Sequence, residues 1–252
     1  MTASSSLPKP PRAWQRVPRR PPLREPASSI ELRARIARGL PRAHKDSHDR
    51  LARSARILTR RPGEVFLRQG DPIRLNLVLH GHAALRRTTS DGRELVLGIV
   101  PPGFLFGFSS VAGSPSGVDV VAVTPAQVAQ WSGDDLRPLV IGDPGMALDV
   151  IDGMARFLVR ISDRLDGFIH QDARRRVLRV LAEYEDLFFG EAQVLSRVHL
   201  PGLVGTSREM TGRVVRELER EGMIRRIGRG GLRLVSPNRF RRAVGGSHRE
   251  PA

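Results

Sequence analysis

The stretch "GTSREMTGRVVRELEREGMIRR", residues 205–226, begins with a short polar turn and continues as a charged amphipathic pattern. Residues 195–226 predict a helix, a tight turn at Gly205 and a second helix over 207–221, which Gly222 ends. The following "MIRRIGRGGLRLV" predicts two short strands around a glycine-rich turn. This order indicates a winged helix-turn-helix, whose second helix enters the major groove of DNA N-terminus first.

The first helix of this motif contains Pro201-Gly202. An interior proline costs a helix about 3 kcal/mol unless it lies in the first turn. We therefore expect this helix to begin late, near His199 or Leu200.

Side chains at the start of the second helix suit base reading. Arg208 can donate two hydrogen bonds to guanine O6 and N7, Glu209 can accept one from cytosine N4, and Arg213 follows about one and a half turns later. Each good pairing contributes roughly 1–3 kcal/mol of discrimination between bases. Phosphate contacts are expected at the helix start, further along the helix and in the wing. They are assigned to Ser207, Arg216, Gly228 and Arg229.

A purely structural explanation of these residues is also open. Thr206 and Glu209 have the spacing of a capping box, and Glu209 could pair with Arg213 across one turn. Charge favours the DNA interpretation, because the formal net charge is +16 and residues 197–252 hold 13 Arg against 5 Glu. A non-specific architectural nucleic-acid binder is a second alternative, but it would need no base-reading set.

The part of the chain before residue 132 has a different texture. Short runs rich in Val and Leu alternate with glycines, and Asp91-Gly92 between two runs is a strong hairpin signal. Many short strands with frequent turns are typical of a sandwich or barrel, so this part is expected to be all-β. Two short helices are expected before it, at 29–40 and 46–58. The strand runs are residues 63–71, 74–87, 89–107 and 117–131.

A long helix is predicted to begin at Asp143-Pro144. Its apolar residues follow spacings of three and four, the a/d pattern of a helix that pairs along a narrow seam. We expect this helix to join two copies of the chain in a homodimer; packing of the stripe on the β block is the alternative. The seam residues are Ile151, Met154, Leu158, Ile161, Leu165 and Phe168. A further helix is expected over 175–189.

The chain is expected to divide into two globular parts between basic tails at 1–29 and 241–252. The parts are an all-β domain with its flanking short helices at 30–142 and a DNA-binding domain at 176–240, joined by a dimerisation helix at 143–175. The absence of cysteine excludes disulfides and thiolate-held metals. Neither a membrane span nor a secretory signal is recognised, so a cytoplasmic protein is expected.

Together these motifs resemble the cyclic-AMP receptor protein / fumarate–nitrate regulator (Crp/Fnr) family of bacterial transcription factors, over about residues 30–240. The quoted stretch is similar to the family's recognition helix. "GEVFLRQGD" and "LVLHGHAALRRTTSDGRELVLGIVPPGFLFG" are similar to its β-roll, a jelly roll of the cyclic-nucleotide-binding type. The resemblance implies an α+β homodimer that binds palindromic double-stranded DNA with TGTGA-like half-sites. It also implies that the all-β part at 30–142 is a β-roll sensor domain with a small effector in the β-roll, and that RNA polymerase is a partner.

The expected effector pocket departs from the cyclic-AMP branch of that family. Phe108 follows Gly107 where the branch has glutamate, the next residues supply no arginine for the cyclic phosphate, and the Thr-Ser pair for adenine is Ile161-Ser162. We therefore expect no binding of cyclic AMP in the usual mode. A hydrophobic effector, or a pocket closed by its own side chains, fits better. The pocket residues are Phe106, Gly107, Phe108, Ser109, Ser110, Ile161 and Ser162.

A metal-dependent enzyme of the cupin type is the main alternative from another class. His80 and His82 have the His-x-His spacing of its metal site, but no carboxylate follows within four residues, and Glu94 lies twelve positions on. Two histidines beside a hairpin glycine explain the pattern without a metal. No nucleophile–base pair, P-loop or dinucleotide fingerprint is present, so neither enzymatic activity nor a cofactor is expected.

Overall fold

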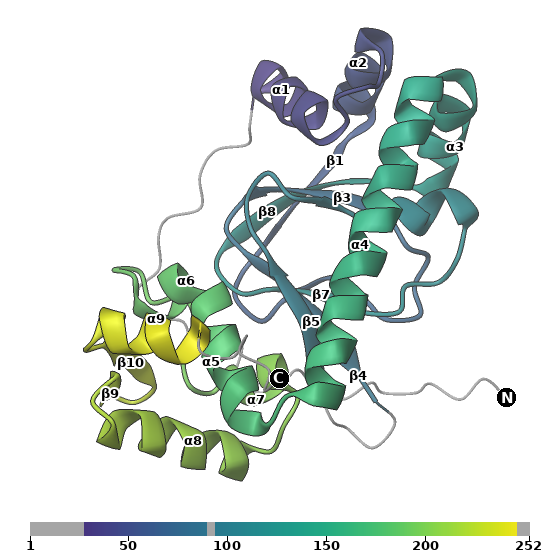
Figure 1. Ribbon diagram of the computed structural model, residues 1–252. Coiled ribbons are helices and arrows are strands. Elements are labelled where there is room, and N and C mark those ends of the chain that lie inside the picture. The colour runs from purple at the N-terminus through teal and green to yellow at the C-terminus, as the bar shows by residue number, and fades with distance from the viewer. Residues whose placement is uncertain (1–27, 90–93, 246–252) are drawn as a thin grey trace, which may run out of the picture.

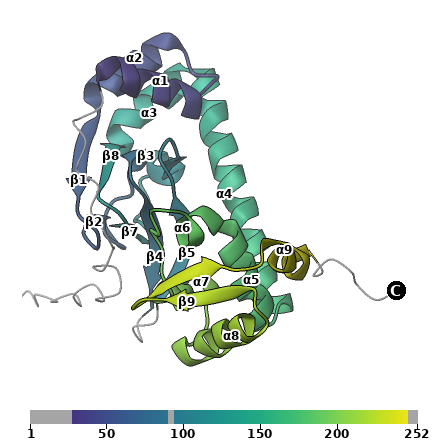
Figure 2. The ribbon, with the colours of Figure 1, turned by 90° about the vertical axis from the view of Figure 1, so that its left-hand side faces the viewer.

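The computed structural model describes residues 28–89 and 94–245. Strands form a roll in the N-terminal half, the long helix α4 (Pro144–His170) runs along its side, and a mainly helical C-terminal unit lies at the far end of α4 (Figure 1). Helices α1 and α2 lie at the opposite end of the molecule in both ribbon views (Figure 2). The predicted α+β architecture is confirmed. Within the described ranges, no helix is both long and apolar enough to cross a membrane.

The roll consists of two four-stranded antiparallel sheets, with strand orders β1-β8-β3-β6 and β2-β7-β4-β5. Val78 and Val128 of the first sheet share a buried cluster with Leu85 and Val120 of the second, so the core lies between the sheets. The predicted Asp91-Gly92 turn lies outside the described residues, between two strands that pair with each other. The strands are β1 (Arg56–Arg60), β2 (Val65–Leu67), β3 (Leu75–His80), β4 (Ala83–Thr88), β5 (Glu94–Val100), β6 (Leu105–Phe106), β7 (Asp119–Ala122) and β8 (Ala126–Trp131).

Two helices around the roll differ from the prediction: one predicted helix is shorter than expected, and one helix was not predicted. The helix predicted over 46–58 ends at Ser54, and residues 56–60 form β1, which pairs with distant β8. A pairing partner so far along the chain leaves no local signal. The missed helix α3 begins with a capping box between Ser132 and Asp135, a sign that was readable in the sequence. The helices are α1 (Ser29–Gly39), α2 (Lys45–Ser54), the short 3-10 helix η2 (Phe108–Ala112) and α3 (Gly133–Gly142).

The start of α4 lies where the sequence predicted it and is firmly held. Asp143 caps the helix by accepting a hydrogen bond from the Met146 amide at 3.1 Å. One turn later, buried Asp149 accepts from the backbone amides of Arg42 at 2.8 Å and Ala43 at 3.1 Å. These bonds attach the first turns of α4 to the segment between α1 and α2.

The C-terminal unit contains the predicted helix-turn-helix and hairpin, with additional helices. The helix predicted over 175–189 is divided in two at Tyr184, whose backbone leaves the helical region at φ −115° and ψ 35°. The elements are α5 (Ala173–Glu183), α6 (Glu185–Phe189), α7 (Leu200–Val204), α8 (Arg208–Arg220), β9 (Ile224–Ile227), β10 (Gly231–Leu234) and α9 (Pro237–Gly245).

Helix α9 extends five residues into the predicted C-terminal tail, over residues 241–245. Phe240 anchors it, since its ring is fully buried and packs edge-on against Phe189 with ring centroids 6.0 Å apart. The rest of this tail, 246–252, and residues 1–27 of the N-terminal one lie outside the described residues. Ser28, at the end of the predicted N-terminal tail, caps α1.

The C-terminal unit packs directly on β5 of the roll. Val96 and Ile99 of β5 share one buried cluster with Leu200 and Leu203 of α7. Gly202 permits this close approach, because a Cβ atom there would lie 3.2 Å from the Val96 side chain. The β-roll and the helix-turn-helix therefore share a hydrophobic core.

Two polar side chains span the same junction. Arg164 of α4 is buried and donates to the Leu97 carbonyl of β5 at 3.2 Å and to the Leu203 carbonyl of α7 at 2.5 Å. The second carbonyl is near the end of α7, where helix carbonyls lack partners within the helix. The Tyr184 hydroxyl accepts from the Ile99 amide of β5 at 3.3 Å. Polar contacts of two largely buried side chains thus connect α4, β5, α7 and the boundary between α5 and α6.

Burial raises the pKa of Tyr184 from 10.0 to about 12, with the neighbouring Glu183 carboxylate adding to the effect. A raised tyrosine pKa means that the folded state prefers the neutral phenol. The neutral phenol of Tyr184 therefore contributes roughly 2–3 kcal/mol to the free energy of unfolding. This stabilisation is complete below pH 10 and is lost as the pH rises through 12. Tyr184 is the single tyrosine of the chain, so its ultraviolet tyrosinate absorbance measures the pKa directly. A tyrosinate titration with its midpoint near pH 10 in the folded protein would contradict the burial of Tyr184 at this junction.

Candidate DNA interface and effector pocket

Helix α7, a tight turn and α8 form the helix-turn-helix. Pro201 lies in the first turn of α7, which follows His199, so the helix begins late as the sequence predicted. Gly205 ends it in the left-handed region at φ +68°, where glycine has no steric penalty. A Cβ atom at Gly205 would also lie 2.5 Å from the Phe168 ring of α4. Two independent constraints therefore require glycine at the turn.

Helix α8 buries one face and exposes the other. The buried residues recur every three or four positions, as expected for an amphipathic helix: Thr211, Val214, Val215 and Leu218. In both ribbon views α8 lies at the lower edge of the molecule, outside the rest of the C-terminal unit. The residues of α8 and its N-cap that were predicted to meet DNA are all exposed: Ser207, Arg208, Glu209, Arg213 and Arg216.

The structural explanation accounts for only some of these residues. Ser207, not Thr206, is the N-cap, and its hydroxyl accepts from the Met210 amide at 3.1 Å. Glu209 and Arg213 approach to 3.9 Å but are both exposed, and such a surface pair contributes little stability. Within the described part of the chain, the Arg208 side chain makes no hydrogen bond or ion pair. Capping explains Ser207 and leaves Arg208, Glu209 and Arg213 available for a ligand.

The β9–β10 hairpin is attached to α8 by Glu219. Its carboxylate accepts from the Arg226 amide at 2.9 Å and from the Arg226 guanidinium at 2.5 Å, and that amide, with the guanidinium, holds the pKa of Glu219 below its usual range. Gly228, at φ +50°, and Arg229 lie exposed at the hairpin tip. The hairpin is therefore fixed beside the helix, with a cation at its tip.

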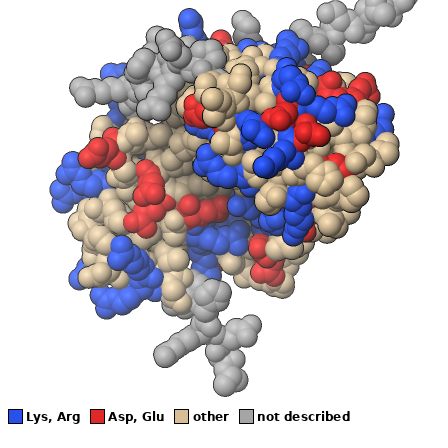
Figure 3. All heavy atoms as spheres, turned by 90° about the horizontal axis from the view of Figure 1, so that it is seen from above, with Lys and Arg blue, Asp and Glu red and all other residues tan. Residues whose placement is uncertain are grey.

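The end of the molecule remote from α8 carries charges of both signs. Seen from that side, Lys and Arg lie interleaved with Asp and Glu and separated by uncharged residues (Figure 3). Acidic partners compensate several cations there, for example Asp49 beside Arg33 and Asp152 beside Arg42. An arginine without an acidic partner in the described segments, such as Arg208, is better suited to bind a polyanion than these paired arginines are.

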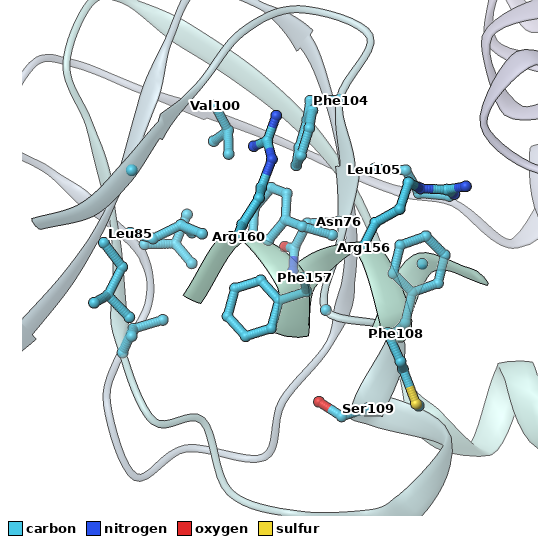
Figure 4. A pocket seen from close by; sticks show the side chains of 18 of the residues that line it. Asn76, Leu85, Val100, Phe104, Leu105, Phe108, Ser109, Arg156, Phe157 and Arg160 are labelled. Atoms are coloured by element: carbon cyan, nitrogen blue, oxygen red, sulfur yellow. The ribbon is translucent and has the colours of Figure 1, made fainter. Parts of the chain in front are cut away.

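A second candidate site is a cavity of about 650 Å³ between the roll and α4. Figure 4 shows it from close by, with Arg156, Phe157 and Arg160 coming from α4 and Leu85, Val100 and Phe104 from the roll. Its volume is within the range of small-molecule sites, roughly 300–1,000 Å³. The position is suited to an effector, because both the sensor sheet and the long helix line the cavity.

Most of the residues predicted for the effector pocket line this cavity: Phe106, Gly107, Phe108, Ser109 and Ile161. The other two do not, since Ser110 is buried in η2 away from the lining and Ser162 is exposed on α4. The sequence reasoning missed Arg156, Phe157 and Arg160. Phe157 lies four residues before Ile161 on the same helix face, and this spacing could have indicated it; Arg156 and Arg160 have no such signal.

The chemistry of the cavity differs from that of a cyclic-nucleotide site. No arginine comes from the segment after Gly107, and its one carboxylate, Asp119, accepts from Arg86 at 2.7 Å and from the Gln69 amide at 2.9 Å. Asp119 is not part of the lining. The cavity therefore lacks a buried cation for the phosphate and a carboxylate for the ribose.

The predicted seam residues of α4 lie on two different faces. Ile151, Leu158 and Leu165 are exposed, whereas Met154, Ile161 and Phe168 are half-buried against the roll and the C-terminal unit. The exposed stripe instead follows Leu148, Ile151, Ala155, Leu158, Ser162, Leu165 and Ile169, which alternate by three and four. A helix that packs on two partners carries apolar residues on both sides, and spacing alone does not separate them.

The histidines of the cupin alternative show no metal site. Within the described ranges, no group of three or more metal-ligating side chains is present. Burial lowers the pKa of His82, which favours its neutral form.

Comparison with known proteins gives consistent results. The model of the cyclic nucleotide-binding domain matches residues 58–143. The cyclic AMP receptor protein of Thermus thermophilus is 31% identical over 165 residues, covering 65% of this chain and 76% of that protein. A CRP-like cAMP-activated global transcriptional regulator of Mycobacterium tuberculosis is 27% identical over 190 residues, covering 72% of this chain and 85% of that protein.

Solved structures agree on the fold. The crystal structure of a putative transcriptional regulator of the Crp/Fnr family from Eubacterium rectale superposes with a TM-score of 0.70, at 15% identity, over 80% of this chain and 95% of that one. Sequence relatives, the β-roll and the helix-turn-helix all lead to one assignment. The chain belongs to the Crp/Fnr family of DNA-binding transcription regulators.

Proposed function

We propose that the protein is a homodimeric, sequence-specific transcription regulator acting in the cytoplasm with RNA polymerase. The observation that carries the proposal is the exposed face of α8, where Arg208, Glu209 and Arg213 have no strong partner within the described residues. Two such helices would enter successive major grooves of a palindrome, with half-sites roughly 10–10.5 base pairs apart. Ser207, Arg216, Gly228 and Arg229 would contact phosphates.

The dimer would form along α4. Its exposed stripe, which includes Ile151, Leu158 and Leu165, has the a/d spacing of paired helices and would otherwise leave large apolar side chains in water. In this proposal residues 143–175 form the dimerisation segment, 30–142 the sensor and 176–240 the DNA-binding part, which α9 extends to residue 245.

The cavity would be the effector site, and β5 would connect it to the DNA-binding part. Leu97 and Ile99 line the cavity, while their backbone groups bond Arg164 and Tyr184 at the junction. An effector that moves β5 would shift the population of dimers with correctly spaced helices. We propose that cyclic AMP, the activator in the name of the Mycobacterium tuberculosis relative, is not bound here in the usual mode.

Fluorescence anisotropy tests DNA recognition. The full chain is titrated against a TGTGA inverted repeat and a scrambled duplex at equal salt, because phosphate contacts depend steeply on salt. Preference for the repeat supports the proposal. If both duplexes bind equally, a randomised DNA library follows, with and without cyclic AMP. Failure to enrich any sequence would overturn specific recognition.

Arg208→Ala and Arg229→Ala separate base reading from phosphate contact. Arg208→Ala should lose roughly 1–3 kcal/mol of discrimination at one base pair of each half-site. Arg229→Ala should weaken repeat and scrambled duplex by similar factors and make the salt dependence shallower by about one unit per site. Arg56→Ala, an exposed change on the remote roll, is the control. Equal losses on both duplexes for Arg208→Ala would contradict its assigned role.

A further inference from the structure

The charged residues of the cavity have one sign. Its lining includes three arginines, Arg38, Arg156 and Arg160, and neither aspartate nor glutamate. Most of the remaining lining is apolar, with rings from the roll and from α4 such as Phe104 and Phe157. A cavity with this composition favours a ligand that is both apolar and negatively charged.

The three arginines are exposed, so their charges lie at the mouth and not in the interior. Arg160 stacks over the Phe104 ring at 5.0 Å and has no acidic partner among the described residues. Arg156 approaches Asp152 only at 3.9 Å, and Arg38 makes one long bond, to the Ala34 carbonyl at 3.4 Å. Their donors are therefore available to an anion at the rim.

The interior offers little to a polar ligand. Asn76 is fully buried, donates to the Arg74 carbonyl at 2.5 Å and accepts from Gln130 at 2.7 Å. Ser116 donates to the Val118 carbonyl at 2.7 Å. The half-buried Ser109 is the one lining hydroxyl left without a hydrogen bond in the described part of the chain. Because a buried polar group without a partner is costly, a sugar or base placed inside would be disfavoured.

We propose that the effector is an amphipathic anion, an unbranched alkyl chain in the cavity with a carboxylate or phosphate head held at the mouth by Arg160 and Arg156. This inference rests on the proposed role of the cavity as the effector site. At the roughly 30 Å³ that a water molecule occupies in the liquid, 650 Å³ corresponds to about 20 non-hydrogen atoms. A chain of medium length fits that volume. Leu97, Gly98, Ile99 and Val100 of β5 would lie along it, so its binding would reach the junction with the DNA-binding part.

Isothermal titration calorimetry on the full chain without DNA tests the ligand class. The probes are decanoate, decyl phosphate, decanol and cyclic AMP, each below its aggregation concentration. Both anions should bind at least ten-fold more tightly than decanol, and the tighter of the two identifies the head group. Equal affinity for decanol and the anions, or heat from cyclic AMP alone, would overturn the proposal.

Variants locate the site. Arg156→Gln with Arg160→Gln should weaken decanoate about ten-fold and leave decanol unchanged, whereas Arg56→Gln on β1 should change neither. Phe157→Ala removes an exposed ring from the cavity, so in a series from hexanoate to hexadecanoate the preferred chain should become longer by two or more carbons. Unchanged affinities in the arginine variant, or an unchanged optimum in Phe157→Ala, would show that the chain binds elsewhere.

Titrating the same protein preparations with operator DNA separates a failure of this inference from a failure of the proposed function. Sequence preference without any binding of the anions would overturn only the ligand class. Binding of decanoate by a chain that selects no DNA sequence would instead overturn the assignment as a sequence-specific regulator.

Discussion

Leu165→Glu is expected to dissociate the dimer and weaken operator binding at least 100-fold. Leu165 is 54% exposed in the single chain and lies on the stripe that would face a second α4. Fully burying a leucine contributes about 1.5–3 kcal/mol. About half of Leu165 remains to be buried and a symmetric dimer buries two copies, so the lost burial is about 1.5–3 kcal/mol, to which the desolvation and mutual repulsion of the two carboxylates add. Analytical ultracentrifugation measures the dissociation, and anisotropy measures the operator affinity.

Leu165→Met is the matched control, because it keeps an apolar side chain of similar volume and should remain dimeric. Met154 and Phe168 belong to the predicted seam but are half-buried within the chain, so their polar variants should reduce stability more than dimer affinity. A dimeric Leu165→Glu protein with unchanged operator affinity would rule out this face of α4 as the interface.

Arg164→Leu is expected to destabilise the fold by about 2–6 kcal/mol. The variant leaves the Leu97 and Leu203 carbonyls buried without their donor, and each lost partner costs about 1–3 kcal/mol. Urea denaturation measures the free energy of unfolding. Because both carbonyls lie at the junction between β5 and α7, hydrogen exchange should accelerate there first.

Arg164→Lys provides the comparison for this change. A lysine ammonium is a point donor and does not have the fork of a guanidinium, so it should restore one carbonyl and recover about half of the loss. Full stability in Arg164→Leu, with unchanged exchange in β5 and α7, would mean that the contact between the roll and the helix-turn-helix does not depend on this side chain.

Several features could be predicted because their signals are local. Gly205 and Gly222 indicate the ends of the two motif helices, and both adopt the positive φ that favours glycine. Asp143-Pro144 marks the start of α4 through a cap and a proline in the first turn. Pro201 correctly predicted the late start of α7. Each of these depends on the backbone of a few adjacent residues.

Other features depend on partners that are distant in the chain. Arg56–Arg60 form a strand only because β8 offers hydrogen bonds, and the predicted helix gave way to that pairing. Arg164 looked like any charged residue of α4, yet it is buried between two carbonyls from β5 and α7. Local propensity carries no information about either partner.

The sequence by itself determined that this chain has an all-β block, a long helix and a winged helix-turn-helix, since periodicity, caps and turn glycines act over a few residues. That the block is a β-roll followed from its resemblance to the family. Only the tertiary structure decided which apolar face of α4 packs on the roll and which is exposed, as Ile161 and Leu165 illustrate. It also decided that arginines of α4 lie at the mouth of an apolar cavity. The physical reason is that the burial of a side chain depends on every element packed around it, and spacing along one helix describes only that helix.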